Sequence, residues 1–127
     1  EALLQGARWV QAVERNPKIA AAARRNLQGL GNRWQDHWAL EVTPVERWLQ
    51  SQCQQPFDLI YADPPYGAGL YQSIAELIRS GGWLQPDGQL LLECERQGKP
   101  SPPSGWSQHK ERRYGRSLVL QWKLDAG

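Results

Sequence analysis

The chain has 127 residues, of which 40% are hydrophobic and 22% are charged, and its formal net charge is +2. These values exclude a disordered tail and a fibrous protein and predict a single globular domain over residues 1–127, large enough to bury a core without disulfide or metal crosslinks. No apolar run approaches 18 residues and no leader of basic and then apolar residues opens the chain, so we expect neither a membrane span nor a signal peptide.

The first half of the chain alternates strand and helix signals. Arg8–Glu14 is a short apolar run typical of a strand. Asn16 and Pro17 then supply an N-cap and a proline at the first helical position. We therefore expect an alanine-rich helix to begin there and to end near Gly29–Gly31.

The alternation continues through the middle of the chain. A second strand is predicted at Trp38–Val42, followed by a helix from about Thr43 through Gln50. Phe57–Ala62 is apolar enough for a third strand inside a sheet covered on both faces. A further helix is expected around Tyr71–Ser80.

The last third of the chain has the signals of extended structure. Pro86–Gly88 has the composition of a turn and precedes a fourth strand, Gln89–Glu95. The proline-rich segment 98–105 is expected to be a loop, and Trp106–Tyr114 and Arg116–Lys123 predict a hairpin. The order predicts an α/β protein with a mostly parallel sheet and an antiparallel C-terminal hairpin, in which ligands bind beyond the carboxyl ends of the strands.

The third strand leads directly into Asp63-Pro64-Pro65-Tyr66. Two consecutive prolines stiffen the backbone and remove two N–H donors, so this turn offers carbonyl acceptors. Asp63 and the Pro64 carbonyl are suited to accept both hydrogens of an exocyclic amine, while Tyr66 stacks on the attached ring. The turn is therefore a candidate site for a nucleobase amino group, against the alternative of a strand that merely ends in a proline turn.

The tetrapeptide DPPY after a strand resembles the (D/N)PP(Y/F/W) motif of S-adenosylmethionine-dependent amino-methyltransferases. With GARWVQAVERNPKIAAAARRNL before it and KERRYGRSLVLQW after it, the chain resembles the RsmD family, bacterial methyltransferases that act on guanine N2 of small-subunit ribosomal RNA. The resemblance spans essentially the whole chain. It implies a Rossmann-like class I methyltransferase fold, S-adenosylmethionine as the cofactor, no metal, and ribosomal RNA, free or within the small ribosomal subunit, as the partner.

Glu14 ends its predicted strand just before a helix, where a carboxylate can accept hydrogen bonds from ribose hydroxyls. The resemblance implies that role towards S-adenosylmethionine, although an ordinary solvated charge at a strand end is the alternative. In nucleotide-binding folds this acid lies about 20 residues after a glycine-rich turn. We therefore expect that turn and the first central strand to precede Glu1, and a chain without methionine agrees with this expectation.

The resemblance also implies an aspartate that contacts the adenine amine after the next strand, but Pro44 stands at that place here. Adenine recognition is then expected to depend on the backbone N–H of Val45 and on neighbouring apolar side chains. Arg15 flanks the same pocket, and Asp63 completes the expected cofactor contacts. Asn16 has the pattern of a helix cap rather than of a ligand.

Positive charge gathers at both ends of the chain. Residues 8–33 hold six Lys and Arg against one acid, residues 34–95 hold two against nine, and residues 96–123 hold seven against one. Such polarity suits a polyanion bound beside an acidic centre, although solvated helix and strand faces give the same pattern. The candidate RNA-binding residues lie on the predicted hairpin, where a charged edge strand that resists aggregation is the alternative: Lys110, Arg112, Arg113, Tyr114 and Arg116.

The two cysteines, Cys53 and Cys94, lack the short spacing of a zinc or redox motif and indicate free thiols in a reducing cytoplasm. His37 and His109 show no partner spacing either, so no metal site is predicted. The predicted function is methyl transfer to the exocyclic N2 of a guanine in small-subunit ribosomal RNA. Adenine-N6 methylation of DNA, and a non-catalytic nucleic-acid or cofactor-binding domain, remain as alternatives.

Overall fold

The computed structural model describes residues 9–63 and 68–126. The chain divides into two compact units, an N-terminal unit of residues 1–48 and a C-terminal unit of residues 49–127. Each unit has its own sheet, with two strands in the first and four in the second. The single domain predicted over residues 1–127 stays a prediction.

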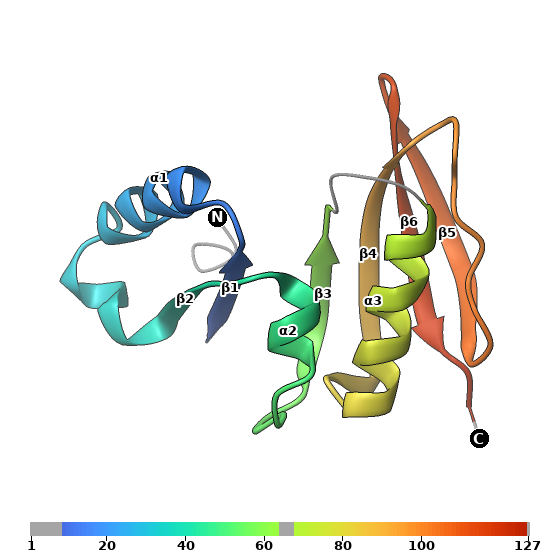
Figure 1. Ribbon diagram of the computed structural model, residues 1–127, viewed down its shortest axis with the longest axis horizontal. Coiled ribbons are helices and arrows are strands. Elements are labelled where there is room, and N and C mark those ends of the chain that lie inside the picture. The colour runs from blue at the N-terminus through green and yellow to red at the C-terminus, as the bar shows by residue number, and fades with distance from the viewer. Residues whose placement is uncertain (1–8, 64–67, 127) are drawn as a thin grey trace. The chain divides into compact units, whose positions relative to one another are not determined.

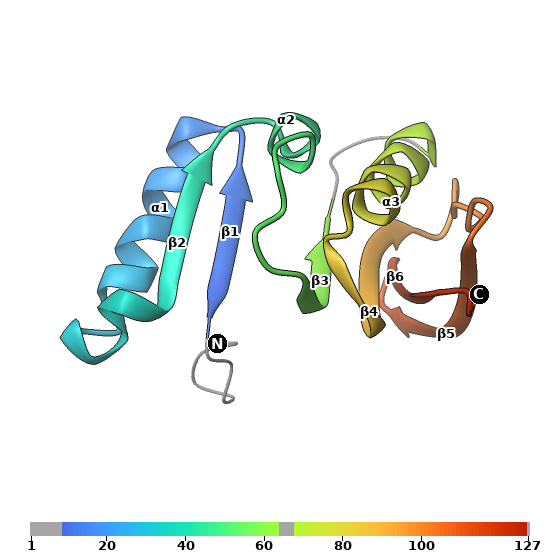
Figure 2. The same ribbon diagram turned by 90° about the horizontal axis from the view of Figure 1, so that it is seen from below.

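In the N-terminal unit, β1 (Val10–Glu14) pairs in parallel with β2 (Trp38–Val42). The connection between them is α1 (Pro17–Gln28) and a short 3-10 helix, Asn32–His37, and α1 lies along the two strands (Figure 2). A parallel pair needs such a crossover because the chain must return to the same end of the sheet. After β2 the chain enters α2 (Val45–Leu49).

The start of α1 follows from its cap. Asn16 is extended, and its Oδ1 accepts hydrogen bonds from the backbone N–H groups of Lys18, at 2.9 Å, and Ile19, at 3.4 Å. These bonds satisfy two donors that the first turn of a helix leaves without partners. The prediction that Asn16 caps this helix is confirmed.

The C-terminal unit holds a mixed four-stranded sheet (Figure 1). Its strand order is β3-β4-β6-β5. The first pair is parallel and the other two pairs are antiparallel, so β5 and β6 form the predicted C-terminal hairpin. The four strands have these bounds: β3 Phe57–Ala62, β4 Leu84–Glu95, β5 Trp106–Tyr114 and β6 Ser117–Leu124.

One face of this sheet is covered by α3 (Ala68–Gly81), as Figure 2 shows. The helix buries residues at helical spacing and the central strands bury every second residue, which is the pattern of a helix packed on a sheet. The loop after β4 also borders this face, where the Gln72 side chain donates to the Ser101 carbonyl at 3.2 Å. The buried residues include Ile74, Ala75 and Ile78 of α3 and Leu90, Leu92, Leu118, Leu120 and Trp122 of the strands.

The strand β3 differs from its prediction. Its apolar sequence predicts burial on both faces, yet Leu59 and Tyr61 are 54% and 55% exposed. The reason is its place in the described sheet, where β3 is an edge strand and α3 covers only one face.

The predicted turn at Pro86–Gly88 is wrong, because these residues lie inside β4. Between the pairs Phe57–Leu84 and Leu59–Gln89, two residue steps along β3 correspond to five along β4, so the extra residues form an irregularity in the strand. A Cβ at Gly88 would lie 2.6 Å from the Leu84 side chain. Glycine at position 88 therefore avoids a clash with the Leu84 side chain inside β4.

Candidate active site and nucleic-acid interface

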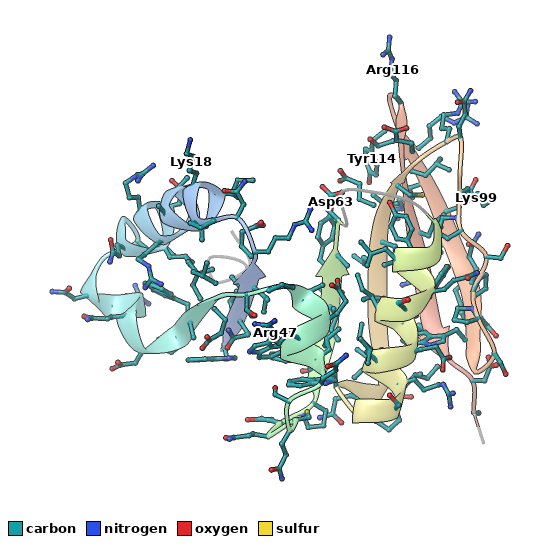
Figure 3. All side chains as sticks on the ribbon, in the orientation of Figure 1. Lys18, Arg47, Asp63, Lys99, Tyr114 and Arg116 are labelled. Carbon is teal, nitrogen blue, oxygen red and sulfur yellow. The ribbon has the colours of Figure 1, made fainter. Side chains whose placement is uncertain are left out.

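Asp63 directly follows β3, at the carboxyl end of the strand, and is exposed (Figure 3). The register pairs Ala62 with Leu92 on the parallel neighbour β4. Asp63 and Glu93 are therefore the next residues on two adjacent strands. Strand alternation places both on the face of the sheet opposite the buried Leu92.

Tyr61 joins this pair of acids. Its hydroxyl donates a hydrogen bond to Glu93 Oε1 at 2.5 Å. The hydrogen bond to Glu93, assisted by partial burial, raises the pKa of Tyr61 to about 12. Tyr61 therefore stays protonated at neutral pH and holds one oxygen of the Glu93 carboxylate.

Glu93 also changes the chemistry of Asp63. Partial burial, then the charge of Glu93 and a hydrogen bond to it, raise the pKa of Asp63 above 3.8. A higher pKa makes the Asp63 carboxylate a stronger proton acceptor. From α3, the Tyr71 hydroxyl donates to the backbone carbonyl of Glu93 at 2.9 Å, so Glu93 is held both at its backbone and at its side chain.

Glu93 is absent from the residues predicted for the site. The signal was its place near the end of the fourth strand, but only the pairing of β4 with β3 brings it to Asp63. The other residues of the motif, Pro64, Pro65 and Tyr66, lie outside the described residues, and the roles predicted for Pro64 and Tyr66 stay predictions.

In the N-terminal unit, Glu14 ends β1 and its Oε1 accepts the backbone N–H of Asn16 at 3.1 Å. The backbone carbonyl of Glu14 accepts from Thr43 N at 3.0 Å, which ties the end of β1 to the segment before α2. Val45 is the first residue of α2, so its N–H belongs to the donors that a helix leaves unpaired. Arg15 follows Glu14 and is exposed.

The Glu14 carboxylate and the Val45 N–H fit the hydrogen-bonding groups of a nucleoside. A carboxylate has two oxygens to accept ribose hydroxyls, and a helix-terminal N–H can donate to a ring nitrogen. These roles of Glu14, Arg15 and Val45 towards a cofactor stay predictions.

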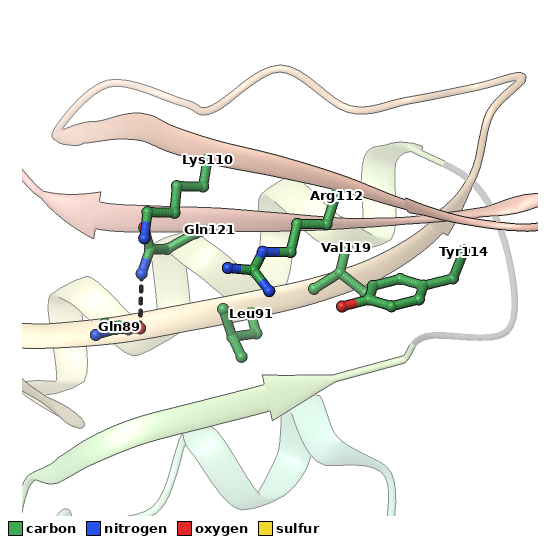
Figure 4. Close-up of a pocket in the computed structure, with 7 residues that line it drawn as sticks. All are labelled: Gln89, Leu91, Lys110, Arg112, Tyr114, Val119 and Gln121. Atoms are coloured by element: carbon green, nitrogen blue, oxygen red, sulfur yellow. Dashed lines mark hydrogen bonds between the residues drawn. The ribbon is translucent and has the colours of Figure 1, made fainter.

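The hairpin residues divide by strand alternation. The face of this sheet opposite α3 is called the open face below. On it, Lys110, Arg112 and Tyr114 of β5 line a groove of about 310 Å³ (Figure 4), and Tyr114 is 58% exposed. Arg113 points to the other face of β5 by alternation, and Arg116 lies at the tip of the hairpin (Figure 3). The groove is completed by Gln89, Leu91, Val119 and Gln121, with a 2.6 Å hydrogen bond from Gln121 to Gln89.

The groove and the acid pair share one face of one sheet. The register pairs Glu93 with Val119 and Val119 with Arg112. Asp63 and Arg112 therefore lie at opposite ends of a row across four strands, about 14 Å apart at the usual strand spacing. A polyanion bound in the groove could therefore extend across the same face of the sheet to Asp63. Because β5 is also an edge strand, the alternative of a protective charged edge remains open.

Among the described residues, no group of three or more His, Cys, Asp or Glu side chains is placed to hold a metal ion. The same ranges contain no helix that is long and apolar enough to span a membrane. Cys94 is buried and Cys53 is partly exposed, both as free thiols.

The fold is that of the Rossmann-like class I methyltransferases, as predicted. A solved structure of a proposed methyltransferase from Escherichia coli superposes with a TM-score of 0.85 at 24% identity, covering 100% of this chain and 70% of that one. A methyltransferase from Podospora anserina, solved with S-adenosylhomocysteine bound, gives a TM-score of 0.68 at 16% identity, with 93% and 61% covered.

The chain belongs to the family described as Conserved hypothetical protein 95, whose family model matches residues 1–123. It is 27% identical over 124 residues to Ribosomal RNA small subunit methyltransferase D of Haemophilus influenzae, covering 98% of this chain and 63% of the relative. The protein of the same name from Escherichia coli is 32% identical over 129 positions, with 99% and 62% covered. The resemblance to the RsmD family is confirmed, and the chain spans less than two thirds of these curated relatives.

Proposed function

We propose that the protein containing this chain transfers a methyl group from S-adenosylmethionine to the exocyclic N2 of a guanine in small-subunit ribosomal RNA. The family and the names of the curated relatives support this proposal. The observation that carries it is the exposed Asp63 carboxylate, beside Glu93 at the carboxyl end of a sheet strand. The substrate is ribosomal RNA, naked or in the assembling small subunit, in the cytoplasm.

Bound S-adenosylmethionine supplies an electrophilic methyl group. In this proposal Glu14 accepts hydrogen bonds from its ribose hydroxyls, and the Val45 N–H donates to its adenine. Arg15 flanks the same nucleoside. The residues of the C-terminal unit act on the base.

The amino group of guanine is a poor nucleophile because its lone pair is delocalised into the ring. Asp63 and the Pro64 carbonyl accept its two hydrogens, which favours a tetrahedral nitrogen with an exposed lone pair. Tyr66 stacks on the base and offsets part of the cost of unstacking it. The proton that the amine loses on methylation passes to the Asp63 carboxylate, whose raised pKa favours its acceptance.

In this proposal the groove on the face of the sheet that carries Asp63 binds the RNA. Lys110 and Arg112 bring two positive charges to phosphates, and the exposed ring of Tyr114 offers a face for stacking. Arg113 and Arg116 extend the positive field beyond the groove. These contacts orient the strand that carries the target base.

A methyl-transfer assay with labelled S-adenosylmethionine tests the proposal on naked ribosomal RNA, assembling small subunits and a DNA duplex. Digestion of the RNA should show the label in N2-methylguanosine. Asp63→Ala should abolish transfer, while Asp58→Ala, which removes an exposed acid on the same strand, should retain it. Full activity of Asp63→Ala would overturn the assignment of this residue.

The same assay separates the alternatives. Transfer to DNA adenine and not to RNA would identify the DNA methyltransferase instead. Binding of RNA or of S-adenosylhomocysteine with no transfer to any substrate would identify a non-catalytic domain.

A further inference from the structure

Glu93 is held more firmly than an ordinary exposed acid. Its carboxylate accepts from the Tyr61 hydroxyl at 2.5 Å, and its backbone carbonyl accepts from the Tyr71 hydroxyl at 2.9 Å. Both tyrosines come from elements that flank β4, so the direction of the Glu93 side chain is set by its neighbours. The partly buried Glu93 side chain stands beside Asp63 on the open face of the sheet.

Two acceptors side by side distinguish the nucleobases. In guanine the exocyclic amine is next to the ring N1–H, so its edge presents two adjacent donors. In adenine the amine is next to a ring N1 that carries a lone pair and accepts. A pair of carboxylates matches the first edge and repels the second.

We propose that Glu93 is a specificity-determining residue, whose carboxylate accepts the N1–H of a guanine while Asp63 accepts the adjacent amine. Tyr61 is its positioning residue, because it occupies one oxygen of Glu93 and directs the other. This inference rests on the proposed function and adds to it the reason for choosing guanine over adenine.

The test uses an RNA hairpin that the wild-type protein methylates, made with either guanine or 2-aminopurine at the target position. 2-Aminopurine keeps the amine but has hydrogen in place of O6, so its N1 carries a lone pair and accepts where guanine N1–H donates. Because a hydrogen bond to a charged group is lost, the wild-type protein should prefer guanine in kcat/KM by about 10- to 100-fold. Glu93→Gln should lose most of this preference, since its amide can accept from guanine or donate to 2-aminopurine.

Two further variants show what is specific to Glu93. Tyr61→Phe should reduce the preference by less, because Glu93 remains but is no longer oriented. Glu76→Gln changes an exposed acid of α3 that pairs with Arg79, and it should keep the full preference. Thermal unfolding of each variant reports whether it is folded.

If Glu93→Gln keeps the wild-type preference for guanine, the inference is overturned even though the proposed function stands. If Glu93→Gln transfers to neither hairpin, the affinities for the two hairpins are compared. The ratio of the two affinities of Glu93→Gln should then be close to one, and a ratio equal to that of the wild-type protein contradicts the inference. If the wild-type protein methylates no RNA, the proposed function fails and this inference fails with it.

Discussion

Asp63 and Glu93 occupy equivalent positions on adjacent parallel strands, one residue beyond the pair Ala62 and Leu92. Thirty residues separate them in the sequence, and the hairpin strand β6 borders the same strand β4 on its other side. The site is thus built where strand pairing brings two acids together at one end of a sheet. In the proposed function, the chemistry of this site depends on both acids rather than on the DPPY motif alone.

The raised pKa of Asp63 predicts a pH dependence of stability. A carboxyl that binds its proton more tightly in the folded state destabilises the fold as the pH rises from 3.8 through its folded pKa. We expect Asp63→Asn to match the wild-type stability below pH 3.8 and to exceed it at neutral pH, while methyl transfer is lost. Urea denaturation across this range checks the prediction, with Asp58→Asn as the control. An equal effect of both substitutions would contradict it.

Tyr61 predicts an effect at alkaline pH. Its folded pKa of about 12 lies above the ordinary 10.0, so its hydrogen bond to Glu93 stabilises the fold below pH 10.0 and this contribution disappears as the pH approaches 12. The stability difference between the wild-type protein and Tyr61→Phe should therefore shrink over this interval. Unfolding midpoints measured at increasing pH test this, and a constant difference would rule out the role of the hydrogen bond.

Glu14→Gln should weaken the binding of S-adenosylhomocysteine by about 10- to 100-fold, because a carboxylate that accepts from ribose hydroxyls is replaced by a neutral amide. At saturating cofactor, methyl transfer should change much less. Calorimetric titration measures the affinity. The control is Glu41→Gln, which changes an exposed acid on β2. An unchanged affinity of Glu14→Gln would remove Glu14 from the cofactor site.

The basic groove predicts the salt dependence of RNA binding. Lys110→Ala and Arg112→Ala should each weaken binding and lower the slope of log K against log salt concentration by about one unit, because one phosphate contact is lost. Lys18→Ala, an exposed lysine of α1, should leave the slope unchanged. If the groove variants keep the slope and aggregate, the charges protect an edge strand instead.

The core of the C-terminal unit predicts a contrast between two leucines. Leu92 is fully buried, whereas Leu59 is 54% exposed. Leu92→Ala should cost about 2–5 kcal/mol of unfolding free energy, since it leaves a cavity, and Leu59→Ala should cost about 0.5 kcal/mol. Urea denaturation measures both. A similar cost for the two substitutions would show that the open face is buried in solution.

Much of the local structure follows from local sequence. Asn16-Pro17 sets the start of α1 because a cap and a first-turn proline act within one turn. The strands Trp38–Val42, Phe57–Ala62 and Trp106–Tyr114 have the predicted bounds. The turn predicted at Pro86–Gly88 is wrong because these residues form the irregularity inside β4, between the pairs that Leu84 and Gln89 make with β3.

The sequence by itself determined the family, the α/β order of elements and the acid at the end of β3, since these depend on local pattern and on a motif of four consecutive residues. Only the tertiary structure decided that Glu93, bound by Tyr61, lies beside Asp63 and that Lys110 and Arg112, but not Arg113, share its face of the sheet. The physical reason is register. Which residues meet across strands depends on how distant segments pair, and a shift of one residue would turn each side chain to the opposite face.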